Sequence, residues 1–264
     1  MNVSRPQRLA VFSDVHGNLP ALEAVLVDIQ SQRIDSLINL GDLLSGAVDP
    51  AGTVQRLRAL GAVTVSGNHE RQVLETARRN LSLSDALVLD TISSEDLAWL
   101  RTIPRTAIPA PNVLAFHGTP NSDSTYLLQT VTSDGIREAT EEEVLDRLGE
   151  HASEWEVLLC GHTHLGRIRQ LTAGALVVNP GSVGLPAYRD SAPYDHIVET
   201  GTPHASYAIV EGSEGKWSAE LVLIPYDSDA AAALAEKNCR PDVASALRTG
   251  FLQKTSISRP AKPV

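Results

Sequence analysis

Cysteine, methionine and aromatic residues are scarce in this sequence. Its 264 residues include two cysteines, Cys160 and Cys239, one methionine, and only 4% Phe, Trp and Tyr. Two cysteines are too few for a disulfide framework, which favours a protein of the reducing cytoplasm. The first residues contain no apolar segment of signal-peptide length before a small-residue cleavage site, so we expect no secretory signal.

Long apolar runs and an excess of positive charge are also missing. No apolar run approaches the roughly 18 residues of a membrane span, so no membrane partner is expected. The 22 Lys and Arg residues face 32 Asp and Glu residues, which gives a formal net charge of −10. This deficit disfavours binding to polymeric nucleic acid, because such binding depends on a basic surface. A small anionic substrate stays compatible if a metal ion supplies positive charge locally.

The hydrophobic content of 42% and the length are those of a globular protein with a sizeable core. In the first two-thirds we expect strands at 9–12, 36–40 and 63–66, helices at 19–30 and 53–60, and a further helix from Glu70. This alternation predicts parallel strands joined by crossover helices. After a helix around 94–101, short strands are expected at 113–116, 157–160, 168–171, 175–178, 207–210 and 219–224. Few helices separate them, which favours a second, more antiparallel sheet.

Two long polar segments, 118–140 and 184–204, lack clear periodicity and are predicted to be functional or mobile loops. Glu141–Glu143 is typical of the acidic first turn of a helix. An Ala-rich stretch from Ser228 predicts another helix, and the tail 255–264 is expected to be frayed. We therefore divide the chain into a main domain, 1–225, and a C-terminal helical extension with its tail, 226–264. The oligomeric state stays open.

Five short polar motifs each follow a predicted strand directly. Taken singly, each has an ordinary interpretation, such as a helix cap, a turn or a hydrogen-bonded core histidine. In open α/β sheets, however, ligands bind beyond the carboxyl ends of the strands, so these motifs should converge on one rim. The motifs are Ser13-Asp14-Val15-His16-Gly17, Gly41-Asp42, Gly67-Asn68-His69-Glu70, His117-Gly118 and Gly161-His162-Thr163-His164.

The combination of imidazole, carboxylate and amide side chains predicts metal binding. The candidate ligands are Asp14, His16, Asp42, Asn68, His117, His162 and His164. Seven ligands exceed what one tetrahedral ion takes, so two metals that share a carboxylate are predicted. Nitrogen and oxygen ligands without a thiolate favour Mn, Fe, Zn, Co or Ni over Ca. On extended backbone, side chains two residues apart point the same way, so each of the Asp-x-His and His-x-His pairs should reach one centre.

The order of the motifs, D-x-H, G-D, G-N-H-E, H-G and G-H-T-H, resembles that of the calcineurin-like metallophosphoesterase superfamily over residues 10–182. The segments F-H-G-T-P at 116–120, N-P-G-S-V-G at 179–184 and A-S-Y-A at 205–208 resemble its small bacterial phosphodiesterase branch. The resemblance implies an α/β fold, a four-layer α/β/β/α sandwich in which two mixed sheets pack between helices.

The same resemblance implies roles for the motif residues. One metal would be held by Asp14, His16, Asp42 and His164, and the other by Asp42, Asn68, His117 and His162. Both would be divalent transition metal ions, most readily manganese. Asp42 would bridge them together with a hydroxide that attacks phosphorus, and His69 would protonate the leaving group. Asn68 and His69 would contact the substrate. Independently of the resemblance, Arg189 in the loop Tyr188-Arg189-Asp190 is a candidate to supply a further cation to the substrate, although a solvated loop arginine is the favoured interpretation.

The stretch Gly41-Asp42-Leu43-Leu44-Ser45-Gly46 departs from the G-D-x-x-D-R-G of the superfamily's Ser/Thr protein phosphatases. The second Asp and the Arg are absent, which disfavours a protein phosphatase. The Asp that would orient His69 in those enzymes is therefore missing, and the partner that orients His69 here stays open. We expect hydrolysis of a small or nucleotide-like phosphodiester. Asymmetric dinucleoside polyphosphate hydrolysis, phosphomonoester hydrolysis and a non-enzymatic protein-interaction scaffold of the same fold are the alternatives.

Several other residues receive surface assignments. His151, His196 and His204 are predicted to lie on the surface. Tyr126, Tyr188 and Tyr194 fall in the two long polar segments and are predicted to face solvent, with stacking on a nucleobase as the alternative.

Overall fold

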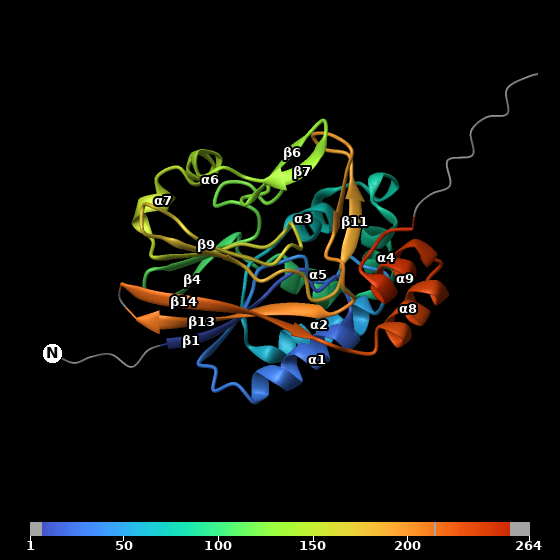
Figure 1. Ribbon diagram of the computed structural model, residues 1–264. Coiled ribbons are helices and arrows are strands. Elements are labelled where there is room, and N and C mark those ends of the chain that lie inside the picture. Colours follow the sequence, from blue (N-terminus) through green and yellow to red (C-terminus); the bar gives the residue numbers. More distant parts are fainter. Residues whose placement is uncertain (1–6, 214, 254–264) are drawn as a thin grey trace, which may run out of the picture.

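Two five-stranded sheets pack face to face in the computed structural model, which describes residues 7–213 and 215–253 (Figure 1). The predicted frayed tail lies outside the described residues. The first sheet has the order β14 (Lys216–Ile224), β13 (Ala205–Ser213), β1 (Gln7–Phe12), β2 (Ser36–Asn39) and β3 (Val63–Thr64). The second has the order β4 (Thr106–Ala110), β5 (Val113–Phe116), β8 (Val157–Leu159), β10 (Leu176–Asn179) and β9 (Arg167–Gln170).

Both sheets are mixed to the same degree, which corrects the expectation that the second would be the more antiparallel. In the first sheet β1, β2 and β3 are parallel, and β13 and β14 add antiparallel strands. In the second, β5, β8 and β10 are parallel, and β4 and β9 add antiparallel edges. The error arose because the late strand β13 returns to pair with β1 in the first sheet, and β14 pairs with β13 at its edge.

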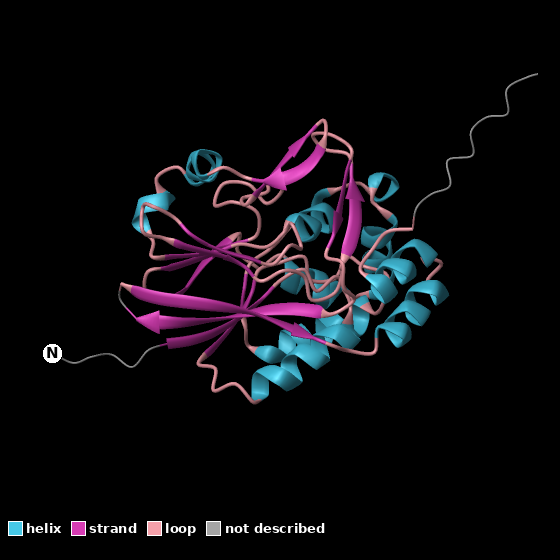
Figure 2. Ribbon diagram, in the orientation of Figure 1, coloured by secondary structure: helices cyan, strands magenta, loops and turns pink. Residues whose placement is uncertain are grey.

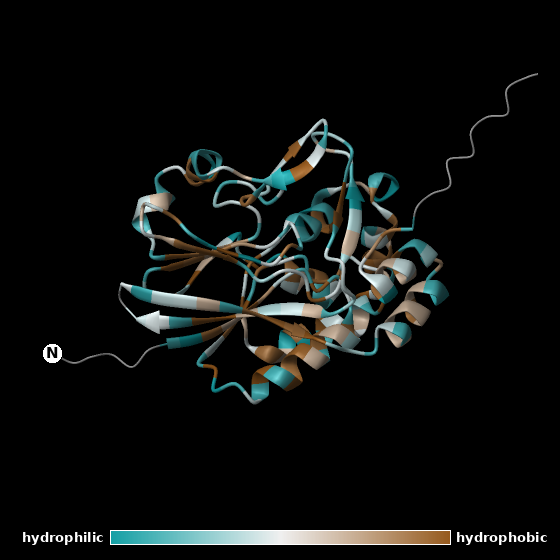
Figure 3. Cartoon of the chain, viewed as in Figure 1, coloured by the Kyte–Doolittle hydropathy of each residue, from teal (hydrophilic) through white to brown (hydrophobic). Residues whose placement is uncertain are grey.

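Helices cover the outer faces of both sheets (Figure 2). The first sheet is covered by α1 (Leu19–Gln30), α2 (Pro50–Leu60), α4 (Leu83–Thr91) and α5 (Ser94–Leu100), which pack in one apolar cluster with its strands. The second is covered by α6 (Glu141–Leu148) and α7 (His151–Glu154). A third cluster, with residues such as Val11 and Leu159, fills the space between the sheets, where Figure 3 shows hydrophobic strands. The predicted four-layer α/β/β/α sandwich is confirmed.

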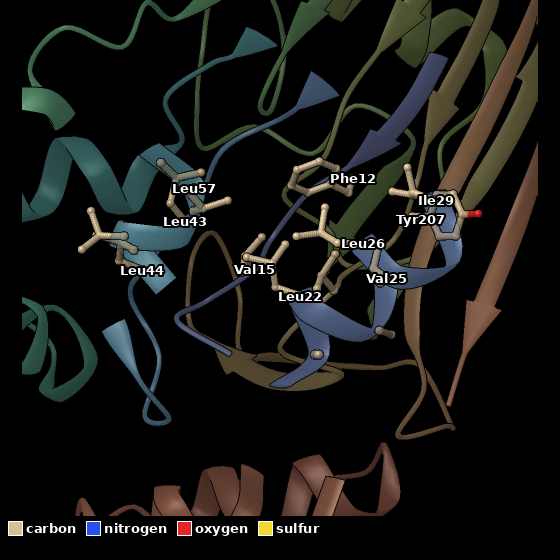
Figure 4. Close-up of a cluster of buried hydrophobic side chains, with 14 of the residues drawn as sticks. Phe12, Val15, Leu22, Val25, Leu26, Ile29, Leu43, Leu44, Leu57 and Tyr207 are labelled. Carbon is tan, nitrogen blue, oxygen red and sulfur yellow. The ribbon is translucent and has the colours of Figure 1, made fainter. Parts of the chain in front are cut away.

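Helix α1 illustrates how the local sequence determines these elements. The Asn18 side chain accepts a hydrogen bond from the backbone N–H of Ala21, and a proline occupies the first turn, so the helix begins where both signals place it. Leu22, Val25, Leu26 and Ile29 recur at helical spacing and are buried. Figure 4 shows this stripe directed at Phe12 of β1 and Tyr207 of β13. Helix α2 begins at Pro50 rather than at residue 53, because Asp49 caps it.

Both segments predicted to be unpatterned loops contain a β-hairpin. Strands β6 (Gln129–Thr132) and β7 (Gly135–Glu138) pair in one, and β11 (Ala187–Asp190) and β12 (His196–Glu199) pair in the other. Each strand has four residues, too short for alternation to emerge from the sequence. Strand β11 contacts α9 (Pro241–Thr249) and lines one cavity together with residues of α3 (Asn68–Glu75). Figure 1 shows β11 past the ends of the two sheets.

The C-terminal helices form a fourth apolar cluster with the segment that follows Asp42. Helix α8 (Ser228–Lys237) begins where the Ala-rich stretch predicted it, and α9 follows it. Alanines of α8 and Leu247 of α9 pack against Ala47 and Val48. Asn238 donates hydrogen bonds to the carbonyl oxygens of both of these residues, at 3.0 and 3.1 Å. None of the described helices is long and apolar enough to cross a membrane.

Candidate metal centre

The five motifs converge, although about 150 positions separate the first from the last. Each follows the carboxyl end of a strand: β1, β2, β3, β5 or β8. Two groups of side chains form, and within each group the potential ligand atoms all lie within 4.8 Å of one another. The first group is Asp14, His16 and His164, and the second is Asp42, His117 and His162. The position of each motif after a strand predicted that the motifs would converge, and the side chains of these six residues do lie together.

The backbone at these residues is not extended, which corrects the expectation about the two i, i+2 pairs. Asp14 and His16 have φ of 56° and 49°, and His162 and His164 have φ of 70° and 60°. Asp42 has φ of 52°. The left-handed region is uncommon for residues other than glycine, and strain of this kind concentrates at functional sites. Both pairs still reach one rim, but they do so through left-handed turns.

Three of the four candidate ligand histidines have their Nδ1 atoms engaged by backbone carbonyl oxygens. Nδ1 of His16 lies 2.6 Å from the oxygen of Ser45, that of His117 lies 2.7 Å from Leu40, and that of His164 lies 2.6 Å from Leu185. A carbonyl can only accept, so Nδ1–H donates and the Nε2 lone pair is left for the site. Hydrogen bonding of the second ring nitrogen is the usual arrangement of metal-binding histidines.

In the first group, the Nε2 atoms of His16 and His164 lie 3.1 Å apart. Two lone pairs at this distance repel unless a proton or a cation lies between them. Burial and the charge of His164 lower the pKa of His16 to about 4, so a proton is disfavoured on His16 at neutral pH. Oδ1 of Asp14 lies 3.3 Å from Nε2 of His164, is buried, and has no hydrogen bond within the described chain. These three donors fit a cation.

The second group also brings acceptors together. Nε2 of His117 lies 3.1 Å from Oδ2 of Asp42 and 3.2 Å from Oδ1 of Asn68. Burial would lower the pKa of His117, but the charge of Asp42 and their hydrogen bond raise it to about 10 before any cation binds. Burial and the neighbouring charge of His117 lower the pKa of His162 to about 4. A metal here therefore has to displace a proton from His117, whereas His162 is ready to bind.

Asp42 is held in place by Glu70 and by the backbone around Gly67. The buried Glu70 carboxylate accepts hydrogen bonds from the backbone N–H groups of Asp42 (2.9 Å), Leu43 (2.8 Å) and Gly67 (2.8 Å). The backbone N–H of His69 donates to Oδ1 of Asp42 at 3.0 Å. A Cβ atom on Gly67 would lie 2.2 Å from that oxygen, so only glycine fits. Glu70 lies in one of the five motifs, but no signal in the sequence indicated this supporting role.

His69 lies beside the two groups and is oriented by Asp85. Its Nδ1 lies 2.8 Å from Oδ1 of Asp85, whose Oδ2 accepts a hydrogen bond from Ser82 at 2.6 Å. The partner that orients His69, left open by the sequence, is therefore an Asp that α4 supplies from outside the motifs. Burial would lower the pKa of His69, but the charge of Asp42 and the contact with Asp85 raise it to about 9. A protonated His69 is suited to act as an acid.

Tyr126, Tyr188 and His196 form a hydrogen-bonded network behind the His-x-His turn. The hydroxyl of Tyr126 lies 2.6 Å from that of Tyr188 and 3.0 Å from Nε2 of His196. Tyr188 also donates to the carbonyl oxygen of His162 at 3.3 Å. Tyr126 and His196 are buried, so their predicted surface positions are wrong. Each belongs to a different strand or loop, and only the tertiary fold reveals that they meet. Tyr194 is exposed, as predicted.

A cavity of about 630 Å³ opens over the site. His69, Asn68 and parts of both ligand groups line it, together with Arg189 of β11. Arg189 is exposed and lines the cavity. Its position is compatible both with a solvated side chain and with contact to a substrate. A cavity of this size accommodates a whole organic ligand rather than a phosphate alone.

Residues 8–210 match the model of the calcineurin-like phosphoesterase superfamily domain. The chain belongs to this superfamily. Its members are metal-dependent phosphoester hydrolases, in agreement with the two ligand groups brought together here. The motif order had predicted this membership.

The chain is similar in sequence to an uncharacterized protein of Methanocaldococcus jannaschii, with 26% identity over 89% of this chain and 94% of that protein. Its fold is similar to that of a metallophosphoesterase from Sphaerobacter thermophilus, with a TM-score of 0.71, 22% identity, and coverage of 93% of this chain and 99% of the other. A hypothetical protein from Pyrococcus horikoshii gives a TM-score of 0.70 at 16% identity, with the same coverage.

Proposed function

We propose that the protein is a phosphodiesterase that uses two divalent transition metal ions, most readily manganese, to hydrolyse a small or nucleotide-like phosphodiester. One observation carries the proposal above the others. The Nε2 atoms of His16 and His164 face each other at 3.1 Å while their Nδ1 atoms are engaged by carbonyl oxygens. Such a pair, beside the unbonded carboxylate oxygen of Asp14, is a donor set for a cation.

The proposed ligands follow the two groups. Asp14, His16 and His164 hold one ion, and His117, His162 and Asn68 hold the other. Asp42 belongs to the second group, where Oδ2 lies 3.1 Å from Nε2 of His117, and its charge also influences the pKa of His16 in the first group, so Asp42 would be the carboxylate shared by the two ions. When bound, the two ions supply Lewis-acid stabilisation of phosphoryl oxygens and lower the pKa of water. With Asn68 as a neutral ligand, the two aspartates leave a net positive charge that favours an anionic substrate.

His69 is the proposed general acid. It lines the cavity beside the two groups, with about a quarter of its side chain exposed, so it can reach a leaving oxygen. The contact between Nδ1 and Asp85 fixes the ring and directs Nε2–H toward the cavity. A proton delivered from Nε2 converts the departing alkoxide into an alcohol, which lowers the barrier to P–O cleavage.

The non-enzymatic scaffold is disfavoured by the same donor set. A scaffold has no need for buried aspartates and histidines at positive φ, because each such residue lowers stability unless a ligand compensates for it. All seven proposed ligands carry side chains competent to bind a metal. The strain and the burial of this cluster are accounted for by catalysis.

The test is turnover of bis(p-nitrophenyl) phosphate by metal-stripped protein to which single ions are added back. We expect activity with manganese, and two metal equivalents per chain at saturation. Asp42→Ala and His117→Ala should each remove activity, whereas His204→Ala, at an exposed position, should keep it. A panel of cyclic nucleotides, dinucleoside polyphosphates and phosphomonoesters then ranks the substrate classes. Equal turnover by the wild-type protein and both site variants would reject the proposal.

A further inference from the structure

The start of the C-terminal helix α9 contributes to the lining of the catalytic cavity. Arg240, Asp242 and Val243 line the same cavity as His69 and Asn68. These residues lie at the start of α9, outside the segment that matches the superfamily model. Since α9 contacts β11 and α8 contacts α1, the helices are packed against the catalytic unit. The cavity is therefore completed by a part of the chain that carries none of the proposed ligands.

Arg240 is held rigidly at this wall. Its Nε and Nη2 donate to the two carboxylate oxygens of Asp242 at 2.9 and 2.7 Å, and Nη1 donates to Oγ of Ser84 at 2.7 Å. These bonds use three of the five N–H donors of a guanidinium group. Only 18% of the side chain is exposed. A fixed guanidinium with two remaining donors is pre-organised to bind an anion.

A second cation faces the same cavity from β11. Arg189 has no ion pair and no side-chain hydrogen bond with any residue of the described ranges 7–213 and 215–253. Both oxygens of Asp242 are engaged by Arg240, and Oδ1 of Asp190 accepts from the backbone N–H groups of Ser191 and Ala192. Unused N–H donors therefore outnumber unused acceptors on this wall. The complementary ligand group is rich in oxygen acceptors.

Apolar side chains lie in the lining as well. Leu185, Val243 and Leu252 border the cavity together with the ring of Tyr188. Such a surface favours the carbon skeleton of an organic substrate, and the polar groups of the same lining can fix its orientation. The cavity thus offers a cationic metal centre, an apolar stretch and a guanidinium wall.

We infer that Arg240 and Arg189 form a subsite for a second phosphate group of the substrate, separate from the phosphodiester that is cleaved. The inference rests on the proposed function and names the substrate class for it: an organic phosphodiester that carries a further phosphate monoester. A terminal phosphate offers three oxygens and close to two negative charges, which suits two guanidinium groups from different elements better than a planar carboxylate does. Arg240 is the specificity-determining residue, because it is the one fixed in place.

The test compares two chromogenic esters that differ only in the second phosphate: thymidine 5′-(p-nitrophenyl phosphate) and the same compound with a 3′-phosphate. Wild-type protein should hydrolyse the 3′-phosphorylated ester with the higher kcat/KM. Arg240→Gln should lower kcat/KM for that ester by about 10- to 100-fold, the effect of losing a hydrogen bond to a charged group, and leave the other ester nearly unchanged. Arg189→Gln should act in the same direction with a smaller effect, since Arg189 is not fixed.

Arg248→Gln is the matched control. Arg248 lies on the same helix, pairs with Asp229 and Glu236, and does not line the cavity. The Arg248→Gln substitution removes one positive charge from α9 at a position outside the subsite. The kcat/KM for both esters should therefore stay at the wild-type value. Retained hydrolysis of the ester without the 3′-phosphate shows that Arg240→Gln is folded.

A binding measurement separates this inference from the proposed function. Thymidine 3′,5′-bisphosphate should bind more tightly than thymidine 5′-monophosphate to wild-type protein in calorimetry, and Arg240→Gln should remove that difference. If wild-type protein hydrolyses neither ester with any metal, the proposed function fails, and the calorimetric comparison still decides the subsite. If Arg240→Gln affects both ligands equally or neither, or if Arg248→Gln has the same effect, the subsite is wrong.

Discussion

Nδ1 of His69 lies 2.8 Å from Oδ1 of Asp85, although the two residues belong to different helices and only His69 lies in a recognisable motif. Asp85 is the third residue of α4, and Ser82, the N-cap of that helix, donates to its other oxygen. The acid and its orienting carboxylate are thus assembled by the packing of α3 against α4. The first prediction follows from this contact.

Asp85→Asn should weaken the acid. The asparagine keeps the shape but removes the charge that helps raise the pKa of His69 to about 9. The pKa of His69 should therefore fall, and the alkaline limb of the pH–rate profile should move to lower pH. We expect kcat to drop by about tenfold at neutral pH, a part of what a general acid contributes. Asp90→Asn, on the same helix with an exposed ion pair to Arg78, should leave the profile in place.

Metal binding at the second group should compete with protons. His117 is protonated below its pKa of about 10 before a cation binds, so each ion bound there releases a proton. Apparent affinity for manganese should rise with pH through the neutral range, close to tenfold per pH unit for one displaced proton. Calorimetry in buffers of different ionisation enthalpy measures that release. Uptake of both ions with no proton released contradicts this assignment.

Glu70→Gln should destabilise the turn that carries Asp42. Both carboxylate oxygens of Glu70 accept from backbone N–H groups, and a glutamine offers only one acceptor oxygen. At least one buried N–H then loses its partner, at a cost of about 1–3 kcal/mol in the free energy of unfolding. Urea unfolding measures the loss, and manganese affinity should fall with it. Glu75→Gln, at an exposed position of the same helix, should change neither quantity.

Tyr126→Phe should reduce stability through His196. The substitution removes the hydroxyl that contacts Tyr188 and Nε2 of the buried His196, which leaves that nitrogen without a partner. The expected cost is about 1–3 kcal/mol in the free energy of unfolding. Tyr194→Phe is the control, because the Tyr194 side chain is exposed and His196 contacts only its backbone oxygen. Equal free energies of unfolding for the two variants would show that the hydrogen-bond network does not contribute to stability.

Predictions from the sequence succeeded where the information was local. Helix α1 has its cap, its proline and its apolar stripe within thirteen residues, so its limits were predicted without error. The seven proposed ligands were found because each lies directly after an apolar strand, and strand ends meet in a sheet of this class. The hairpin β11–β12 and the position of β13 were missed. The strands of the hairpin have only four residues each, and the place of β13 depends on its pairing with β1, far away in the sequence.

The sequence alone determined the superfamily and the set of side chains available to hold metal, because both depend on residue type and order. The tertiary structure decided which groups act together: Asp85 with His69, Glu70 with Asp42, Tyr126 with His196, and Arg240 with the cavity. In each case the groups lie in different segments of the chain and belong to no common motif. The distance between them depends on how the helices and loops pack. Hydrogen bonds act over about 3 Å, so contacts of this kind exist only once the chain has folded.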